Sequence, residues 1–420
     1  MKKLLLLFTL LIFLSACSSD EPVVQPETDD SIENDILPGY RSRQEIIDIA
    51  QEYADILYPA SVKSRSARRV VDESRVFALS DLKSRVAEDS DIAPLICIVE
   101  YSDDNGFAII ATPKVVEPVI AVVDHGSYSD SIANSIPAFQ YFMEIATDYV
   151  ATQKEIIDNG PFIGPNDTLP YRIMEYKTEI DTTFAFYADP VIKTNRGQKY
   201  PENLLCSNGY SGCFPTAALM ICEYFKEPSY LKLTYGNSPM TIYLDWDVIS
   251  QVKSDDSPDG PYTLQNLPIA QFARQVGHLA DANYKSSNGT SVNKSKEQPT
   301  LCKLLPDRII GGREDYDFYK VYNAIKDKGL VMFSGTSTEG IGHVWVADGM
   351  RYLRITKKEY ERPVGDFIPW KLTNTTTDLR QYIHFNWGGN GKYNCYCSAY
   401  AIKNPERNYS KHPIYIITVR

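Results

Sequence analysis

The stretch NGYSGCFPTAALMICEYF, residues 208–225, decides the fold of the second half of this chain. After Cys213 the apolar residues recur with the i, i+3, i+4, i+7 spacing of a helix that buries one face. Pro215 suits only the first turn of such a helix, so Cys213 is predicted at the N-cap or the first helical position. Free backbone N–H groups and the positive end of the helix dipole favour an anion there. Because such a site lowers the pKa of a thiol, Cys213 is a candidate nucleophile.

Other cysteines fit structural roles better. A buried thiol is the ordinary alternative even for Cys213, but the Gly-Cys-x-Pro setting at a helix start favours a nucleophile. Cys222 lies inside the same helix and Cys97 lies in an apolar strand, so both are predicted to be core residues. No C-x-x-C occurs, and Cys395-x-Cys397 is poor zinc spacing. The sequence therefore predicts no metal ion and no cofactor.

A nucleophilic thiol needs a base, and His343 is the best candidate among the five histidines. It stands in GIGHVWVADG, residues 340–349, where alternating apolar residues predict a strand and a glycine leaves room beside the ring. Positions 213 and 343 are 130 residues apart, on the order of the 130–150 residues that separate papain-like cysteine–histidine pairs. The other histidines are predicted to be structural or at the surface: His125, His278, His384 and His412.

The N-terminus predicts export. Residues 1–16 carry two lysines and then an apolar run to Leu14, too short to span a bilayer, as in a secretory signal peptide. The LSAC ending at Cys17 resembles the lipobox of bacterial lipoproteins, which implies a lipid on Cys17 and attachment to the outer membrane or the cell surface. The following SSDE resembles the surface-export tag of some Gram-negative lipoproteins. Residues 17–40 are acidic and poor in bulky apolar side chains, so a flexible tether is predicted.

Composition excludes one class of partner. The net charge is −11, whereas nucleic-acid binding requires basic stripes. Besides Cys17 there are seven cysteines, an odd number, so at least one thiol is expected to stay unpaired in an oxidising compartment. With 43% hydrophobic residues, the chain can bury sizeable cores.

Two α+β parts are expected after the tether. Residues 41–185 predict a helix over 42–58 with a Ser42–Glu45 capping box, a hairpin at Asn105-Gly106, and a helix over 136–157 capped by Ser135. Glycines and prolines make residues 159–195 irregular, which predicts a domain boundary. Residues 186–420 then form the second part, with a few helices and many strands.

Several motifs together resemble the streptopain family of cysteine peptidases, papain-like C10-type enzymes that are made as zymogens. GQKYPENLL, residues 197–205, is similar to the family's Q-x-x-P-x-N segment, and SGCFPTAALMICEYFKEP to its G-C-x-x-T-A helix. YLDWDVI, GIGHVWVADG and HFNWGGNGKY are similar, in the same order, to its D-W-D-like, G-H-x-x-V-x-D-G and N-W-G segments. Residues 41–185 resemble the family's propeptide. The resemblance implies a small inhibitory pro-domain followed by a papain-like catalytic domain.

The resemblance also implies roles for individual residues. Cys213 would be the nucleophile and His343 the general base and later acid. The Gln198 amide, with the Cys213 backbone N–H, would form the oxyanion hole. Trp387 matches a tryptophan beside the histidine, and Asn386 would orient the imidazole as third member of the triad.

Two departures from the family pattern concern the cleft. Arg196 stands where the family commonly has tryptophan two residues before the glutamine, and this was expected to alter the cleft entrance. The second tryptophan of N-W-G-W-G-G is missing, because Gly388, Gly389 and Asn390 follow Trp387. A hydrophobic residue at the second position before the cut is the preference that the resemblance implies.

The sequence predicts a secreted or surface-anchored cysteine endopeptidase zymogen, cut between residues 159 and 190. Its partners would be protein or peptide substrates, its own pro-domain as inhibitor, and the membrane through Cys17. Two alternatives stay open. One is a non-catalytic surface lipoprotein that keeps the fold as a binding or inhibitory module. The other is acyl transfer or deamidation by the same thiol.

Overall fold

The structure, a computed structural model, describes most of the chain beyond residue 38. The described residues are 39–59, 68–79, 94–158, 174–235, 238–287, 289–337, 340, 342–363, 369–402 and 413–420. The predicted signal peptide, Cys17 and His412 lie outside them. Within these ranges, no helix combines the length and the hydropathy that a membrane span needs.

The N-terminal part follows the predicted order of elements. They are α1 (Arg43–Leu57), β1 (Val71–Ala78), β2 (Ile96–Tyr101), β3 (Phe107–Ala111), β4 (Val119–Val123), α2 (Asp130–Ser135) and α3 (Pro137–Asp158). The capping box of α1 is confirmed. The Ser42 hydroxyl accepts the Glu45 N–H at 3.2 Å, and the Glu45 carboxylate accepts the Ser42 N–H at 2.7 Å.

The predicted hairpin is also confirmed, and Gly106 explains it. This residue has φ +91°, and a Cβ there would lie 2.0 Å from the Val123 carbonyl oxygen, so only glycine fits. The predicted cap of the following long helix is wrong. Ser135 ends the short helix α2 and its hydroxyl donates to the Ile132 carbonyl, because α3 starts only at Pro137.

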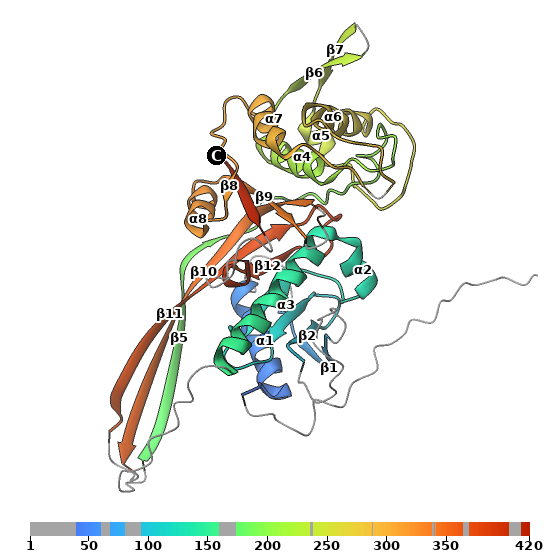
Figure 1. The fold of residues 1–420 in the computed structure, drawn as a ribbon. Coiled ribbons are helices and arrows are strands. Elements are labelled where there is room, and N and C mark those ends of the chain that lie inside the picture. The colour runs from blue at the N-terminus through green and yellow to red at the C-terminus, as the bar shows by residue number, and fades with distance from the viewer. Residues whose placement is uncertain are drawn as a thin grey trace, which may run out of the picture.

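The C-terminal part begins with a strand and a group of helices. Its elements are β5 (Met174–Ala188), α4 (Cys213–Phe225), β6 (Tyr230–Tyr235), β7 (Ser238–Tyr243), α5 (Trp246–Ile249), α6 (Leu267–Leu279), α7 (Glu297–Leu304), β8 (Glu314–Asp315), α8 (Phe318–Lys326), β9 (Leu330–Thr336), β10 (Gly342–Pro363), β11 (Lys371–Asn386), β12 (Cys395–Ser398), α9 (Ala399–Ile402) and β13 (Ile414–Val419). The predicted α+β fold class is confirmed. Helices α4 to α7 gather on one side of the central strands, with the β6–β7 hairpin beyond them (Figure 1).

One sheet runs through both parts of the chain. Its strand order is β1-β2-β3-β4-β12-β11-β10-β9-β13-β8, and β5 pairs with β10 outside this path. The N-terminal strands join the C-terminal ones where β4 pairs antiparallel with β12, with Val123 opposite Cys395 and Ala121 opposite Cys397. The N-terminal part is therefore hydrogen-bonded into the sheet that carries His343.

The predicted irregular segment is only partly irregular. Residues 174–188 form β5, which pairs with β10 from Met174 opposite Pro363 to Ala188 opposite Met350. With β10 and β11 it makes a three-stranded arm that extends away from the rest of the molecule (Figure 1). Proline and glycine suggested a loop, but the partner strand lies about 170 residues away in sequence, where local patterns carry no information.

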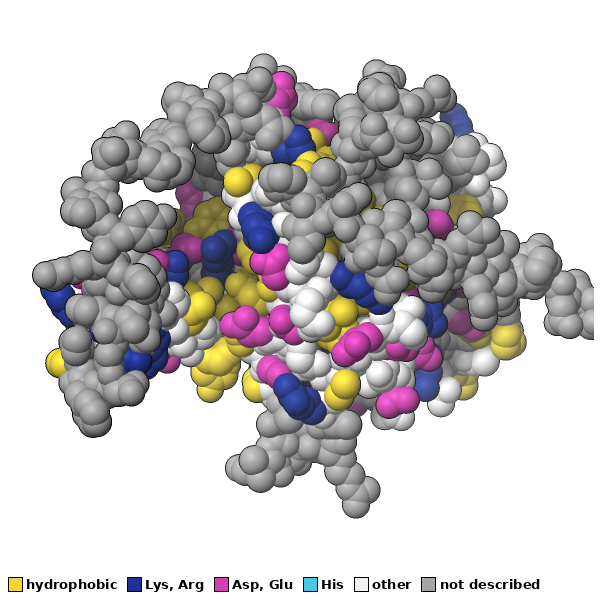
Figure 2. All heavy atoms as spheres, turned by 90° about the horizontal axis from the view of Figure 1, so that it is seen from below, with side chains coloured by type: hydrophobic (Ala, Val, Ile, Leu, Met, Phe, Trp, Pro, Cys, Tyr) yellow, Lys and Arg dark blue, Asp and Glu magenta, His cyan; other side chains and the backbone are white. Residues whose placement is uncertain are grey.

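Helices cover both faces of the shared sheet. On one face α3 packs Phe139 and Phe142 against Trp387. On the other face α1 packs Tyr53 against Tyr382, with ring centroids 5.9 Å apart. Cys97 and Cys222 are buried, as predicted. On the described surface seen from below, acidic and basic side chains are interspersed (Figure 2).

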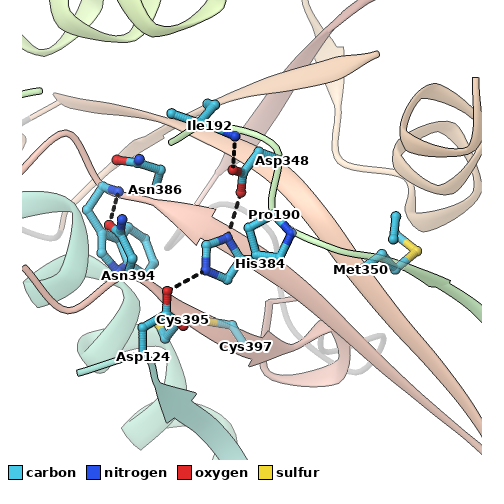
Figure 3. Close-up of polar contacts among 12 residues, drawn as sticks. Asp124, Pro190, Ile192, Asp348, Met350, His384, Asn386, Asn394, Cys395 and Cys397 are labelled. Carbon is cyan, nitrogen blue, oxygen red and sulfur yellow. Dashed lines mark hydrogen bonds and ion pairs between the residues drawn. The ribbon is translucent and has the colours of Figure 1, made fainter. Parts of the chain in front are cut away.

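A buried charge cluster joins the two parts beside the β4–β12 pairing (Figure 3). His384 on β11 lies between Asp348 of β10, 2.6 Å from its Nδ1, and Asp124 just after β4, 3.0 Å from its Nε2. The second oxygen of Asp348 accepts the Ile192 N–H at 2.9 Å. The Tyr58 hydroxyl, at the end of α1, donates to Asp124. His384 is structural, as predicted, and one of its two partners comes from the N-terminal part.

The carboxylates keep His384 charged. Burial by itself lowers the pKa of His384, but the charges of Asp124 and Asp348 outweigh it and raise the pKa to about 10. Burial acts in the other direction on Asp124 and raises its pKa. The charge of His384 outweighs burial, so the pKa of Asp124 is lowered overall. An imidazolium between two carboxylates is thus the stable state of this cluster at neutral pH.

We expect Asp124→Ala to lower the free energy of unfolding by about 3 kcal/mol, because it removes one partner of a buried charge. This value is at the lower end of the destabilisation expected for breaking a buried ion pair, because 23% of the Asp124 side chain is exposed. The contribution of His384 to the free energy of unfolding is fully present below its ordinary pKa of 6.5. It is lost as the pH rises through about 10. That of Asp124 is present above its ordinary pKa of 3.8 and is lost on acidification.

Urea unfolding of the full chain from pH 4 to 10 measures the free energy of unfolding of wild type and of Asp124→Ala. The difference between the two should be largest near pH 6. Asp181→Ala, an exposed aspartate on β5, is the control and should change stability little. Equal effects of the two substitutions would show that the His384 cluster does not join the parts.

Candidate active site

Cys213 is the first residue of α4, as the sequence predicted. Gly212 precedes it as N-cap with φ +101°, and a Cβ there would lie 3.1 Å from the Thr290 side chain, so the entry to the helix requires glycine. Pro215 is in the first turn. The sulfur therefore sits where the backbone N–H groups of α4 have no helical partner.

One cavity of roughly 140 Å³ collects four of the five predicted site residues. Gln198, Cys213, His343 and Trp387 all line it. His343 comes from the second residue of β10 and is 8% exposed. The N–H of Val344, directly after it, donates a hydrogen bond to the Cys213 sulfur. Residues that are 130 positions apart in sequence thus meet where the start of α4 faces the start of β10.

Asn386, the fifth predicted residue, is not among the described residues that line the cavity. It is 1% exposed, and its side-chain oxygen accepts the Gly388 N–H at 3.1 Å. The Trp387 indole N–H donates to the Tyr393 carbonyl at 2.6 Å. Asn386 therefore shapes the turn that carries Trp387 into the cavity wall.

Residues of the N-terminal part close the cavity. The junction of α2 and α3, from Ser135 to Ala138, lines it together with Cys213 and His343. Ile136 is 2% exposed and packs against Gly389, where a Cβ would lie 3.1 Å from its side chain. This junction therefore forms part of the wall of the cavity that holds the sulfur and the imidazole.

Burial sets the protonation of both groups. Although part of the Cys213 side chain faces the cavity, the atoms around the sulfur exclude water, and this raises the pKa of Cys213 to about 11; the Val344 N–H opposes the shift and Glu297 adds to it. Burial also lowers the pKa of His343 to about 4. The thiol and the imidazole are both neutral at pH 7 in this arrangement. The lowered thiol pKa expected from the helix start is wrong here, because desolvation outweighs the helix N-terminus.

The backbone of Gln198 is fixed beside the nucleophile. Its carbonyl oxygen accepts the Ser211 N–H at 2.9 Å, and the preceding Gly197 carbonyl accepts the Thr216 hydroxyl of α4 at 2.9 Å. Asn390 and Asp256 line the same cavity and are joined by a 2.7 Å hydrogen bond. Within the described ranges, no three His, Cys, Asp or Glu side chains are grouped to hold a metal ion.

Arg196 is not at the cleft entrance, where the sequence placed it. It is 0% exposed, and its guanidinium pairs with Glu223 of α4. An altered cleft entrance was expected because Arg196 replaces a tryptophan of the family pattern near Gln198. A single glutamate within the otherwise apolar run ALMICEYF could have revealed the partner, since a carboxylate on a buried helix face needs a cation.

We expect iodoacetamide to modify Cys213 of the full chain slowly at pH 7, because its pKa near 11 leaves little thiolate. The rate should rise about tenfold per pH unit towards that pKa, since thiolate is the reacting form. Peptide mapping by mass spectrometry measures the rate at each cysteine. The exposed Cys302 is an internal reference and should react first. Faster modification of Cys213 than of Cys302 at pH 7 would contradict the burial argument.

Among curated proteins, no sequence matches the chain. A solved structure with a similar fold is a mutant fragment of prointerpain A from Prevotella intermedia, 17% identical, with a TM-score of 0.48 over 77% of this chain and 94% of that chain.

Residues 194–397 match the model of the Peptidase C10 family. All five predicted site residues lie inside this range. The family resemblance found in the sequence motifs is thereby confirmed for this range. Residues 194–397, slightly under half of the chain, are thus similar to cysteine peptidases of the C10 family.

Proposed function

We propose that this chain is the precursor of a secreted or surface-anchored cysteine endopeptidase whose N-terminal part holds the site closed. The observation that carries the proposal is the shared cavity of Gln198, Cys213, His343 and Trp387, covered by residues 135–138. A binding module would not need a thiol, an imidazole and an amide around one cavity.

In the proposed reaction, the Cys213 thiolate attacks the scissile carbonyl carbon and forms a tetrahedral oxyanion. The Gln198 amide and the Cys213 N–H donate to that oxygen. His343, protonated by the thiol, gives the proton to the leaving amine, and a thioester remains. His343 then takes a proton from water, whose hydroxide attacks the thioester and releases the acid and the free thiol. Trp387 would keep water away from the ion pair.

Opening of the α2–α3 junction would switch the site on. Water reaching the cavity would weaken the desolvation that holds Cys213 and His343 neutral, so the thiol pKa would fall and the imidazole pKa would rise. Proton transfer from Cys213 to His343 then gives the reactive ion pair, with the thiolate favoured by the start of α4. The covered precursor would be inactive for an electrostatic as well as a steric reason.

The site of processing is proposed between residues 159 and 173. Of the predicted region 159–190, residues 174–188 are paired with β10 and belong with the peptidase strands. A cut before Met174 would leave this pairing intact. Export, and a lipid on Cys17 that holds the precursor at the outer membrane or cell surface, remain part of the proposal and rest on the N-terminal sequence alone.

A preference for an apolar residue at the second position before the cut is also proposed. Its support is Ile136, whose branched side chain fills the space against Gly389 in the cavity wall. If the junction leaves, the same wall would offer an apolar surface to a substrate side chain, and the absence of a side chain at Gly389 would leave room for it.

We expect the wild-type chain over residues 40–420 to lose its N-terminal part and gain casein hydrolysis on incubation, whereas Cys213→Ala stays intact and inactive. Gels, N-terminal sequencing and casein assays follow both. Limited trypsin treatment covers the case in which another protease is the activator. An inactive, trimmed and folded wild type would favour the binding-module alternative; product analysis with a peptide would separate hydrolysis from acyl transfer.

Gln198→Ala should lower kcat of the processed enzyme on the order of 10²- to 10³-fold, as for the loss of one oxyanion donor. The KM for a peptide substrate should change little, because the amide acts on the transition state. Steady-state kinetics with a fluorogenic peptide measures both constants. The matched control is Gln275→Ala on α6, whose half-buried side chain lies outside the cavity lining and donates to the Lys232 carbonyl at 3.4 Å. A loss confined to KM would exclude the oxyanion role.

A further inference from the structure

A fully buried guanidinium lies two residues before Gln198. Arg196 is 0% exposed, and all three of its nitrogens have partners. Its Nε and Nη2 each donate to Glu223 at 2.9 Å, one to each carboxylate oxygen. Nη2 also donates to the Ile249 carbonyl at 2.8 Å, and Nη1 to the Val252 carbonyl at 2.9 Å. The side chain is therefore held in one orientation from two directions.

The partner carboxylate belongs to the nucleophile helix. Glu223 is on α4, whose first residue is Cys213. The Thr194 hydroxyl donates to the same carboxylate at 3.0 Å, so the segment before Gln198 is attached to α4 twice. Glu223 and Cys213 are held at fixed positions on the same helix. The bonds to Glu223 therefore fix the segment before Gln198 relative to the sulfur.

The backbone between Arg196 and Gln198 is held in place by hydrogen bonds. The Asn390 N–H donates to the Arg196 carbonyl at 2.9 Å, and the Thr216 hydroxyl to that of Gly197 at 2.9 Å. A Cβ on Gly197 would lie 2.1 Å from the Asn390 amide oxygen, so any side chain there would displace Asn390. A displacement of the guanidinium would therefore pass along two residues to Gln198.

We propose that Arg196 is a positioning residue which, through its two-bond pairing with Glu223, holds the Gln198 amide at the oxyanion site facing Cys213. This inference rests on the proposed function and deepens it. Burying an ion pair gives little net stability relative to apolar residues of similar size, so a positional role accounts better for the pair. The planar fork of arginine fixes the pairing in two directions, which a lysine ammonium cannot do.

A second carboxylate determines which variants can test this. Glu202 is buried, its nearest oxygen is 3.8 Å from Arg196 Nη1, and it accepts the Ser254 hydroxyl. Removal of Arg196 alone would leave two buried carboxylates without their cation, and misfolding could follow. Arg196→Lys keeps the charge and loses the fork. The paired variant Arg196→Met with Glu223→Gln removes both charges at similar volume.

The experiment compares these variants with wild type after processing of the full chain. We expect kcat for a peptide to fall on the order of 10²-fold in both, as small misplacements of catalytic groups do, with KM unchanged. The alkylation rate of Cys213 by iodoacetamide should stay at the wild-type value, because alkylation needs the thiolate and no oxyanion hole. Arg308→Lys, in the Glu227 ion pair beyond the end of α4, is the matched control and should keep kcat.

The decisive step repeats Arg196→Lys in a Gln198→Ala background. If Arg196 acts through Gln198, the substitution should lower kcat no further there, because no amide remains to be positioned. The same loss in both backgrounds, or an equal loss of alkylation rate, would overturn the proposal. An inactive wild type would instead defeat the proposed function, whereas an active wild type with unimpaired Arg196 variants would defeat this inference alone.

Discussion

The antiparallel pairing of β4 with β12 is the contact on which the closed state of this protein depends. It makes one sheet from strands of both parts and so fixes the α2–α3 junction, which follows β4, above the cavity. Backbone hydrogen bonds determine register, and the inward-facing side chains follow from it. The covering of Cys213 is thus a consequence of sheet geometry rather than of contacts made by the junction alone.

Buried charge is treated in two opposite ways around this sheet. His384 stays charged because Asp124 and Asp348 lie at hydrogen-bond distance, and the buried Arg196 guanidinium is paired with the Glu223 carboxylate. Cys213 and His343 lack such partners, and burial holds both neutral. The difference follows from electrostatics, since a charge is tolerated in the interior only where a counter-charge compensates for lost hydration. The same interior therefore stabilises the two ionic clusters and keeps Cys213 and His343 uncharged.

These two clusters involve different elements that carry site residues. The His384 cluster ties β10 and β11, which carry His343 and Trp387, to the N-terminal part. The Arg196 cluster ties the Gln198 segment to α4, which carries Cys213. Removal of the N-terminal part would take Asp124 from the first cluster and leave the second unchanged. The hydrogen bonds that link the Gln198 segment to α4 all come from residues of the C-terminal part.

Local patterns identified most of what local chemistry can specify. The capping box of α1, the Gly106 turn, the start of α4 at Cys213 and the strand after His343 all depend on neighbours within a few residues. The motif order likewise located the peptidase region and four of the residues that meet in the cavity. Ser135 failed as a cap because α2 and α3 divide differently from the apolar pattern, one residue later than expected.

The sequence by itself determined the helix that presents Cys213, the strand that presents His343 and the acidic net charge of the chain. Only the tertiary structure decided that β5 joins β10, that Arg196 turns inward to Glu223, and that the thiol is neutral beneath residues 135–138. The physical reason is the separation in sequence of the residues that interact. Helix starts and turns are set by bonds between near neighbours, whereas strand partners, ion pairs and desolvation depend on residues that come together only in the folded chain.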